Sequence, residues 1–106
     1  ARPKGTAIEA PFLTERDGWI YCFAAADFCC RGARSTYKTI VGRSRSLDSP
    51  FVDRDGVRML DGGGSVVARG GPRWRGPGHP GLARDGRTDW LAVHAYDAQA
   101  DGVPTL

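Results

Sequence analysis

One glutamate near the start of the chain lies in an unusual setting for a carboxylate. Glu9 belongs to the stretch Ile-Glu-Ala-Pro-Phe-Leu at residues 8–13, in which the apolar side chains suit a buried strand. An ionised carboxylate loses solvation in such surroundings, so a glutamate there usually has a function. Pro11 cannot donate a ladder hydrogen bond, which favours an edge or innermost strand that borders an open space. Either Glu9 acts chemically in that space, or it is a surface residue that leads into a strand.

The other residue types that could carry chemistry are three cysteines and two histidines. The cysteines, at positions 22, 29 and 30, are odd in number and irregularly spaced, so they indicate neither a disulfide framework nor a zinc site. His79 follows a Gly/Pro-rich loop, where it could bind a ligand or cap that loop. His94 lies inside an apolar segment, which favours a hydrogen-bonded core histidine.

The composition is that of a small folded domain. The chain has 106 residues, of which 41% are hydrophobic and 25% charged. No apolar run is long enough to span a membrane, and the first residues resemble no signal peptide. The formal charge is +3, but most basic residues are scattered arginines, many beside an aspartate. That pattern favours solvated turns over a nucleic-acid surface, so we expect neither nucleic acid nor membrane as a partner.

Short apolar stretches bounded by turn residues predict strands, and no segment has the pattern of a helix. Asp17-Gly18 is typical of a hairpin turn. The segment after it, 19–25, is apolar at every position and should be buried on both faces. The sequence predicts four antiparallel strands, at residues 7–14, 19–25, 37–44 and 57–60.

The pattern then begins again about 70 residues later. Residues 79–86 resemble residues 9–18, and residues 90–97 resemble residues 19–27. A repeating four-stranded antiparallel unit is a propeller blade, which needs neighbours to cover its faces. We expect one blade at 7–61, a connection at 62–78 and an incomplete blade at 79–106. Since so few blades cannot close a ring, the chain is expected to be a fragment.

The repeat also gives the candidate residues a place. First strands line the central channel of a propeller, and the repeat puts Glu9 and His79 at matching points of two such strands. A carboxyl group in a partly apolar channel can hold a proton at neutral pH, as a general acid must. Asp27 and Asp97 end the second strands, which indicates a structural role.

Several segments, taken together, carry a family resemblance. They follow the family's order along nearly the whole chain, at residues 8–12, 27–32, 35–38, 41–44, 49–53, 62–64, 76–79 and 94–97. On these residues the chain resembles the C-terminal part of glycoside hydrolase family 43, most closely its endo-α-1,5-L-arabinanases. The resemblance implies an all-β fold that is part of a five-bladed β-propeller, with 7–61 as the fourth blade and 79–106 as part of the fifth.

The resemblance also implies residue roles. Glu9 matches the general acid of an inverting hydrolysis of α-1,5-linked L-arabinan, whereas the base and a third acidic residue belong to earlier blades. This fragment alone is therefore predicted to be inactive. His79 matches a histidine that binds a metal, usually calcium, with water completing the shell; Pro80-Gly81 departs from the family pattern beside it. Cys29 and Cys30 match a loop that borders the sugar subsite, and their alternatives are inert thiols or a vicinal disulfide.

The resemblance leaves other functions open. An exo-acting arabinofuranosidase or xylosidase of the same fold is one alternative, and a non-catalytic sugar-binding propeller is another. The expected partner is arabinan or an arabino-oligosaccharide, bound by a protein that is monomeric when complete. A polymeric substrate predicts a secreted or periplasmic enzyme.

Overall fold

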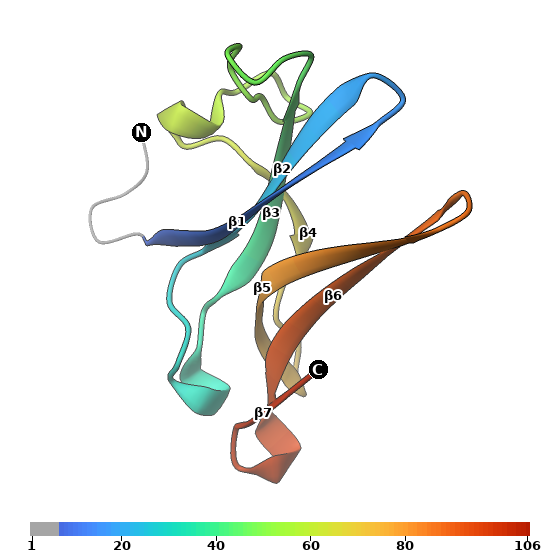
Figure 1. Ribbon diagram of the computed structural model, residues 1–106. Helices are drawn as coiled ribbons and strands as arrows, with labels where there is room; N and C mark the ends of the chain where they lie inside the picture. The colour runs from blue at the N-terminus through green and yellow to red at the C-terminus, as the bar shows by residue number, and fades with distance from the viewer. Residues whose placement is uncertain (1–6) are drawn as a thin grey trace.

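The computed structural model describes residues 7–106 and contains two antiparallel sheets (Figure 1). The first sheet has the order β1-β2-β3-β4, with β1 (Ile8–Arg16), β2 (Trp19–Ala26), β3 (Lys38–Ser44) and β4 (Ser65–Ala68). The second has the order β5-β6-β7, with β5 (Trp74–Asp85), β6 (Thr88–Asp97) and β7 (Val103–Thr105). Three short 3-10 turns are η1 (Gly32–Arg34), η2 (Met59–Asp61) and η3 (Ala98–Ala100). The expected all-β fold class is confirmed.

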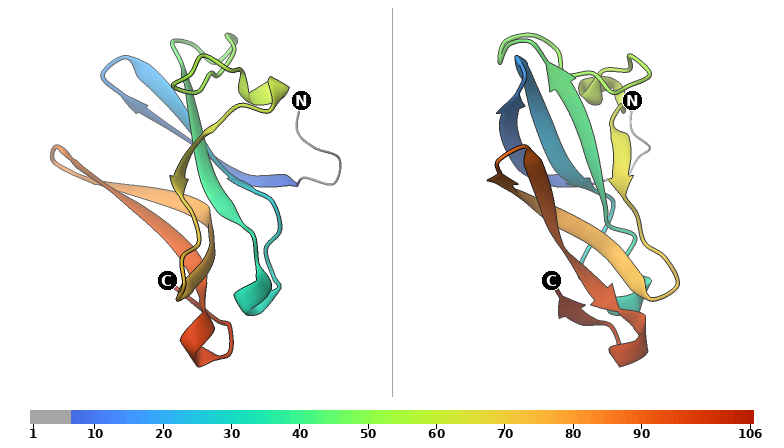
Figure 2. Two further views of the ribbon diagram at one scale, coloured as in Figure 1. Left: turned by 180° about the vertical axis from the view of Figure 1, so that it is seen from behind. Right: turned by 90° about the vertical axis from the view of Figure 1, so that its right-hand side faces the viewer.

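The two sheets meet along β5, which contacts β1, β2 and β3. From there the sheets diverge toward two hairpins, the one between β1 and β2 and the one between β5 and β6, as two views of the ribbon show (Figure 2). The hydroxyl of Thr39 donates to the carbonyl of Pro77 at 3.2 Å where the sheets touch. Such a fan of successive sheets is the relation between neighbouring propeller blades.

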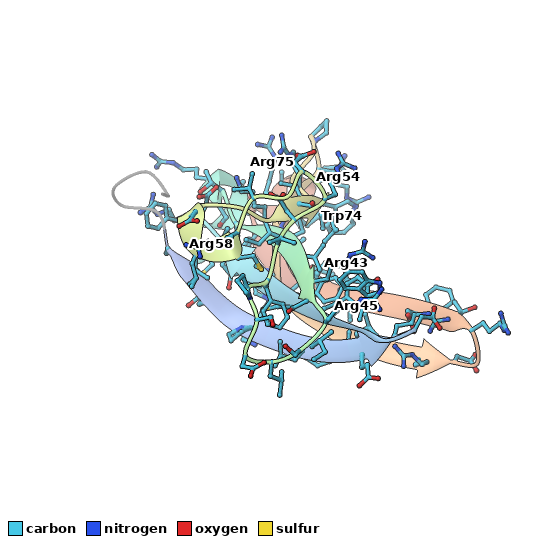
Figure 3. The ribbon with its side chains drawn as sticks, turned by 90° about the horizontal axis from the view of Figure 1, so that it is seen from above. Arg43, Arg45, Arg54, Arg58, Trp74 and Arg75 are labelled. Carbon is cyan, nitrogen blue, oxygen red and sulfur yellow. A yellow bond between two sulfur atoms is a disulfide. The ribbon has the colours of Figure 1, made fainter. Side chains whose placement is uncertain are left out.

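Alternation along the strands divides the first sheet into two faces. One face carries a small core of Ala24, Ala26 and Ile40, with Met59 packed against it. The expectation that 19–25 is buried on both faces holds only for its end, since Ala24 and Ala25 are buried whereas Trp19 to Phe23 are half-buried. Arg43 and Arg45 lie on the same side of the first sheet (Figure 3). Their guanidinium groups lie 3.8 and 3.7 Å from the Trp19 ring centroid, so two cation–π contacts cover this aromatic.

The predicted fourth strand at Val57–Leu60 is wrong. One oxygen of the Asp53 carboxylate accepts the N–H groups of Asp55 and Val57, both at 2.9 Å, and the other accepts that of Gly64 at 3.0 Å. These bonds close residues 53–64 into a loop, so the edge strand that pairs with β3 is β4. The second sheet likewise begins at Trp74, five residues before the expected position 79. Whether the sheets are the fourth and fifth blades stays a prediction.

An ion pair and hydrogen bonds join the hairpin of β1 and β2 to the hairpin of β5 and β6, away from the central contact. Arg16 pairs with Asp89 at 3.1 Å, and Arg84 pairs with the same carboxylate at 2.9 Å. Arg84 also donates to the carbonyl of Glu15 at 2.8 Å. These exposed contacts fix the relative position of the hairpins more than they stabilise the fold. Within residues 7–106, no helix is long and apolar enough to cross a membrane.

Candidate active site

Glu9 lies beside a bulge in β1. The pairing of β1 with β2 shifts register between Glu9, which lies opposite Ala25, and Phe12, which lies opposite Phe23. Ala10 has a φ of 52°, and Pro11 after it has no N–H to donate. The bulge therefore interrupts the ladder where the sequence predicted it. Glu9 itself is exposed, and its Oε1 accepts a hydrogen bond from the Tyr37 hydroxyl at 2.7 Å.

Tyr37 is the most constrained side chain of this site. Only 1% of it is exposed, and its backbone N–H donates to the Phe28 carbonyl at 2.9 Å. The ring lies directly over Gly78 of β5, where any Cβ would overlap ring carbons. Burial, reinforced by the hydrogen bond to Glu9, raises the pKa of the Tyr37 phenol far above its ordinary value. The hydroxyl therefore remains protonated and remains a donor at any working pH.

A cluster of rings joins Tyr37 to the second sheet. His94 stacks on Tyr37 with centroids 5.9 Å apart, and it meets Tyr96 edge-on at 5.7 Å. The His79 ring is tilted against the His94 ring, with centroids 6.2 Å apart. Burial, and then the neighbouring His79, lower the pKa of His94, so its imidazole is neutral at neutral pH; Glu9 acts weakly in the opposite direction. His94 is half-buried and its contacts within the described chain are with rings, rather than the expected core hydrogen bond.

Glu9 and His79 do not match each other in the two first strands. In β5 the register shifts between Gly78, opposite His94, and Gly81, opposite Ala92. His79 has a φ of 52° and precedes Pro80, so it occupies the bulge position that Ala10 occupies in β1. The counterpart of Glu9 is Gly78. The expected match is therefore wrong by one residue, and His79 is the exposed residue of its own bulge.

The cysteine loop reaches the same cluster. Cys29 and Cys30 form a disulfide between neighbouring residues, one of the alternatives that the sequence left open. Cys30 has a φ of 68°, and its N–H donates to the Tyr96 hydroxyl at 2.8 Å. Cys29 is half-buried and Cys30 is exposed. Cys22 keeps a free, half-buried thiol, whose pKa is raised by burial.

The remaining described carboxylates that form hydrogen bonds or ion pairs do so with partners other than Tyr37. Asp27 pairs with Lys38 at 3.1 Å, and Asp97 pairs with Arg73 at 2.9 Å. These pairs at the ends of β2 and β6 fit the structural role expected for both aspartates. Glu9 is thus the carboxylate of this site, with a fixed donor on one oxygen.

The described residues do not form a metal site by themselves. No three His, Cys, Asp or Glu side chains of residues 7–106 lie close enough together to hold an ion. Calcium takes six to eight oxygen ligands, whereas His79 offers one nitrogen. Any ion at His79 would depend on water and on residues outside this chain, so no chemical step is derived through a metal.

The sequence missed two residues of the site, Tyr37 and Gly78. Tyr37 was assigned to a strand and to a segment of the family resemblance, but to no role in the site, because its bond to Glu9 spans 28 positions. Gly78 belongs to a Gly-Pro-Gly segment, 76–78, in which a Cβ at Gly76 would also lie 2.7 Å from the Ser35 side chain. Two glycines one residue apart in a strand indicate close approach of another segment, and that is the signal that could have found them.

Known proteins match this arrangement over most of the chain. Residues 2–106 match the model of glycosyl hydrolases family 43. An extracellular endo-α-(1→5)-L-arabinanase of Bacillus subtilis is 43% identical over 107 residues, covering 100% of this chain and 32% of the relative. An extracellular exo-α-(1→5)-L-arabinofuranosidase of Cellvibrio japonicus is 42% identical over 91 residues, covering 86% of this chain and 26% of the relative.

Solved structures agree with the sequence matches. An α-L-arabinanase of Cellvibrio cellulosa superimposes with a TM-score of 0.88 at 39% identity, covering 92% of this chain and 31% of that one. An endo-arabinanase of Bacillus licheniformis superimposes with a TM-score of 0.87 at 43% identity, covering 93% of this chain and 33% of that one. The chain thus spans about a third of the length of the relatives it matches. The expected fold, part of a five-bladed β-propeller, is confirmed, and the chain belongs to glycosyl hydrolase family 43.

Proposed function

We propose that the complete protein containing this chain hydrolyses α-1,5-linked L-arabinan, with Glu9 as the general acid. The observation that carries the proposal is the Glu9 carboxyl group beside a strand bulge, bonded through one oxygen to the buried Tyr37. The other oxygen is left for a proton and a leaving group. The relatives named above act, by their names, on α-(1→5)-L-arabinan, which supplies the substrate class.

The proposed mechanism divides the work between this chain and the rest of the ring. Glu9 protonates the departing glycosidic oxygen while an aspartate of an earlier blade activates water on the opposite face of the sugar. Inversion requires the two carboxyl groups to be ~6.5–9.5 Å apart. Residues 1–106 alone should therefore show no hydrolysis of arabinan, because the base lies outside them.

Cys29 and Cys30 are proposed as substrate contacts. Their disulfide connects through Tyr96 to the ring cluster that includes Tyr37, and Cys30 is exposed. Two bonded sulfur atoms offer an apolar, polarizable surface on which the carbon face of a sugar can rest. A disulfide also requires an oxidising compartment, which supports export, as do the relatives named extracellular.

Calcium near His79 remains part of the proposal. His79 would be its ligand from this chain, with water and residues of other blades completing the shell. A complete ring stripped with a chelator should regain calcium in titration calorimetry, and His79→Ala should bind it at least tenfold more weakly. Equal binding by both proteins would remove His79 from the site.

Exo action is the second candidate, because one relative is named an endo-enzyme and another an exo-enzyme. The products of linear arabinan distinguish them: an exo-enzyme releases one short product from the start, whereas an endo-enzyme releases a range of lengths. A non-catalytic sugar-binding propeller would bind arabinan without cleaving it. The complete protein is proposed to be a monomer.

The decisive experiment compares two glutamates of the complete protein. Glu9→Gln should lower kcat/KM on linear arabinan about 10²- to 10⁴-fold, the usual contribution of a general acid. Glu15→Gln is the matched control, since among the described residues the Glu15 side chain makes no hydrogen bond or ion pair and only its backbone is engaged, with β2 and with Arg84. The activity of Glu15→Gln should not change. Unchanged activity of Glu9→Gln would overturn the proposed role.

A further inference from the structure

We propose that Tyr37 is the positioning residue of Glu9: its hydroxyl fixes one carboxylate oxygen, so that the other faces the leaving group. The inference rests on the proposed role of Glu9 as the acid. It assigns to Tyr37 an effect on proton transfer beyond its part in packing the two sheets.

Glu9 needs a side-chain partner because its own backbone holds it loosely. The register of β1 is interrupted directly after Glu9, and the side chain is exposed. An exposed glutamate samples several rotamers, and a general acid must present its proton in one direction. The 2.7 Å bond from Tyr37 Oη to Glu9 Oε1 selects one orientation and leaves Oε2 unbonded by Tyr37.

Tyr37 is suited to this task because it cannot turn away. Its backbone N–H donates to the carbonyl of Phe28, and its ring stacks on His94. The ring also packs against Gly78, where the Cβ of any other residue would overlap it. Tyr37 directly precedes β3, in the sheet that contains Glu9, whereas the Gly78 on which its ring packs belongs to β5 of the next sheet. The orientation of Glu9 therefore depends on the contact between the two sheets.

The hydrogen bond also acts on charge. When Glu9 passes its proton from Oε2 to the leaving oxygen, the carboxyl group becomes a carboxylate. A donor on Oε1 then bonds to an anion, and such a bond is stronger and shorter than one to a neutral carboxylic acid. Tyr37 thus stabilises the transition state more than the ground state, without losing its own proton.

The test is a comparison of two leaving groups in the complete protein. Tyr37→Phe should lower kcat/KM about 10- to 100-fold on linear arabinan, whose departing sugar oxygen needs a proton. On a 4-nitrophenyl glycoside of α-1,5-arabinotriose, whose leaving group departs as an anion, the loss should stay within about threefold. A purely structural role would lower both rates equally, and that result would overturn the proposal, as would an unchanged rate on arabinan.

Two further variants separate this inference from the proposed function. Tyr21→Phe is the matched control, because no described group bonds to its hydroxyl, and it should behave as the wild type on both substrates. In a Glu9→Gln background, Tyr37→Phe should cause no further loss on arabinan. If Glu9→Gln is fully active, the proposed function fails; if Glu9→Gln is inactive but Tyr37→Phe has wild-type rates, this inference alone fails.

Discussion

The two sheets use the same bulge to present different chemistry. In β1 the bulge residue is Ala10 and in β5 it is His79, and each has a φ of 52° and precedes a proline. Before the bulge the first sheet has Glu9, whereas the second has Gly78. Glu9 extends toward Tyr37, and the missing side chain of Gly78 is the space in which the Tyr37 ring lies.

The difference teaches that matching backbone positions need not hold matching side-chain chemistry. The repeated unit supplies two neighbouring positions at its bulge, one before it and one within it. The first sheet uses the earlier position for a carboxylate, and the second uses the later position for an imidazole. The remaining positions, Ala10 and Gly78, have small residues, and at Gly78 the Tyr37 ring occupies the space of the missing side chain.

The largest effect should come from filling the space at Gly78. Gly78→Ala places a methyl group where it would overlap the Tyr37 ring, and it should lower the free energy of unfolding by about 1–3 kcal/mol, the usual cost of overpacking. Gly81→Ala is the control in the same strand, since its Cβ would meet no atom within 4 Å. Chemical unfolding of the complete protein measures both. Equal stability of the two variants would show that the sheets can separate at this contact.

A smaller effect should follow from protonating Asp97 at the end of the second sheet. The Arg73 guanidinium, with further help from the Gln99 N–H, lowers the pKa of Asp97 below its ordinary value of 3.8. A carboxylate with a lowered folded pKa adds stability above pH 3.8, which is lost as the pH falls through the folded value.

The measurement is the melting temperature of the complete protein between pH 6 and pH 2. Asp97→Asn should have a lower melting temperature than the wild type at neutral pH. Its melting temperature should fall less on acidification than that of the wild type. Asp27→Asn is the counterpart in the first sheet, where a single lysine pair is removed. If the melting temperature of Asp97→Asn falls with pH as steeply as that of the wild type, the stabilising role of the Asp97 carboxylate is contradicted.

The smallest effect tests the bulge itself. Ala10→Gly should raise the free energy of unfolding by about 0.5 kcal/mol, because glycine adopts a positive φ without the strain that alanine has there. Ala83→Gly, in the regular part of β5, should instead lower it by about 0.5–1 kcal/mol. The same exchange thus has opposite signs at the two positions. If both variants lose stability, the bulge at Ala10 is unstrained.

Local chemistry made much of the fold predictable. The hairpin at Asp17-Gly18, the apolar strand after it and the restart of the pattern depend on neighbouring residues, and the structure has all three. The fourth strand was misplaced because Val57–Leu60 looks apolar, whereas the Asp53 carboxylate, bonded to residues up to eleven positions away, closes that segment as a loop.

The site was less predictable because it depends on register and on packing. The sequence comparison matched residues 79–86 with residues 9–18 by their ends, although the two segments differ in length, so it left the register between them unfixed. In the structure the turn after β1 is at 17–18 and the turn after β5 is at 86–87. Counting back from these turns matches Glu9 with Gly78 and Ala10 with His79. The role of Tyr37 follows from two sheets meeting, and no local pattern contains it.

The Cys29–Cys30 disulfide has a practical consequence for handling the protein. A bond between adjacent residues encloses no length of chain, so it removes almost no entropy from the unfolded state. Its influence is confined to the loop that bonds to Tyr96. Buffers with strong reductants would therefore leave the purified protein folded while changing the loop beside its candidate active site. Preparations that look identical by melting temperature could then differ in activity, so the thiol content should be measured alongside each assay.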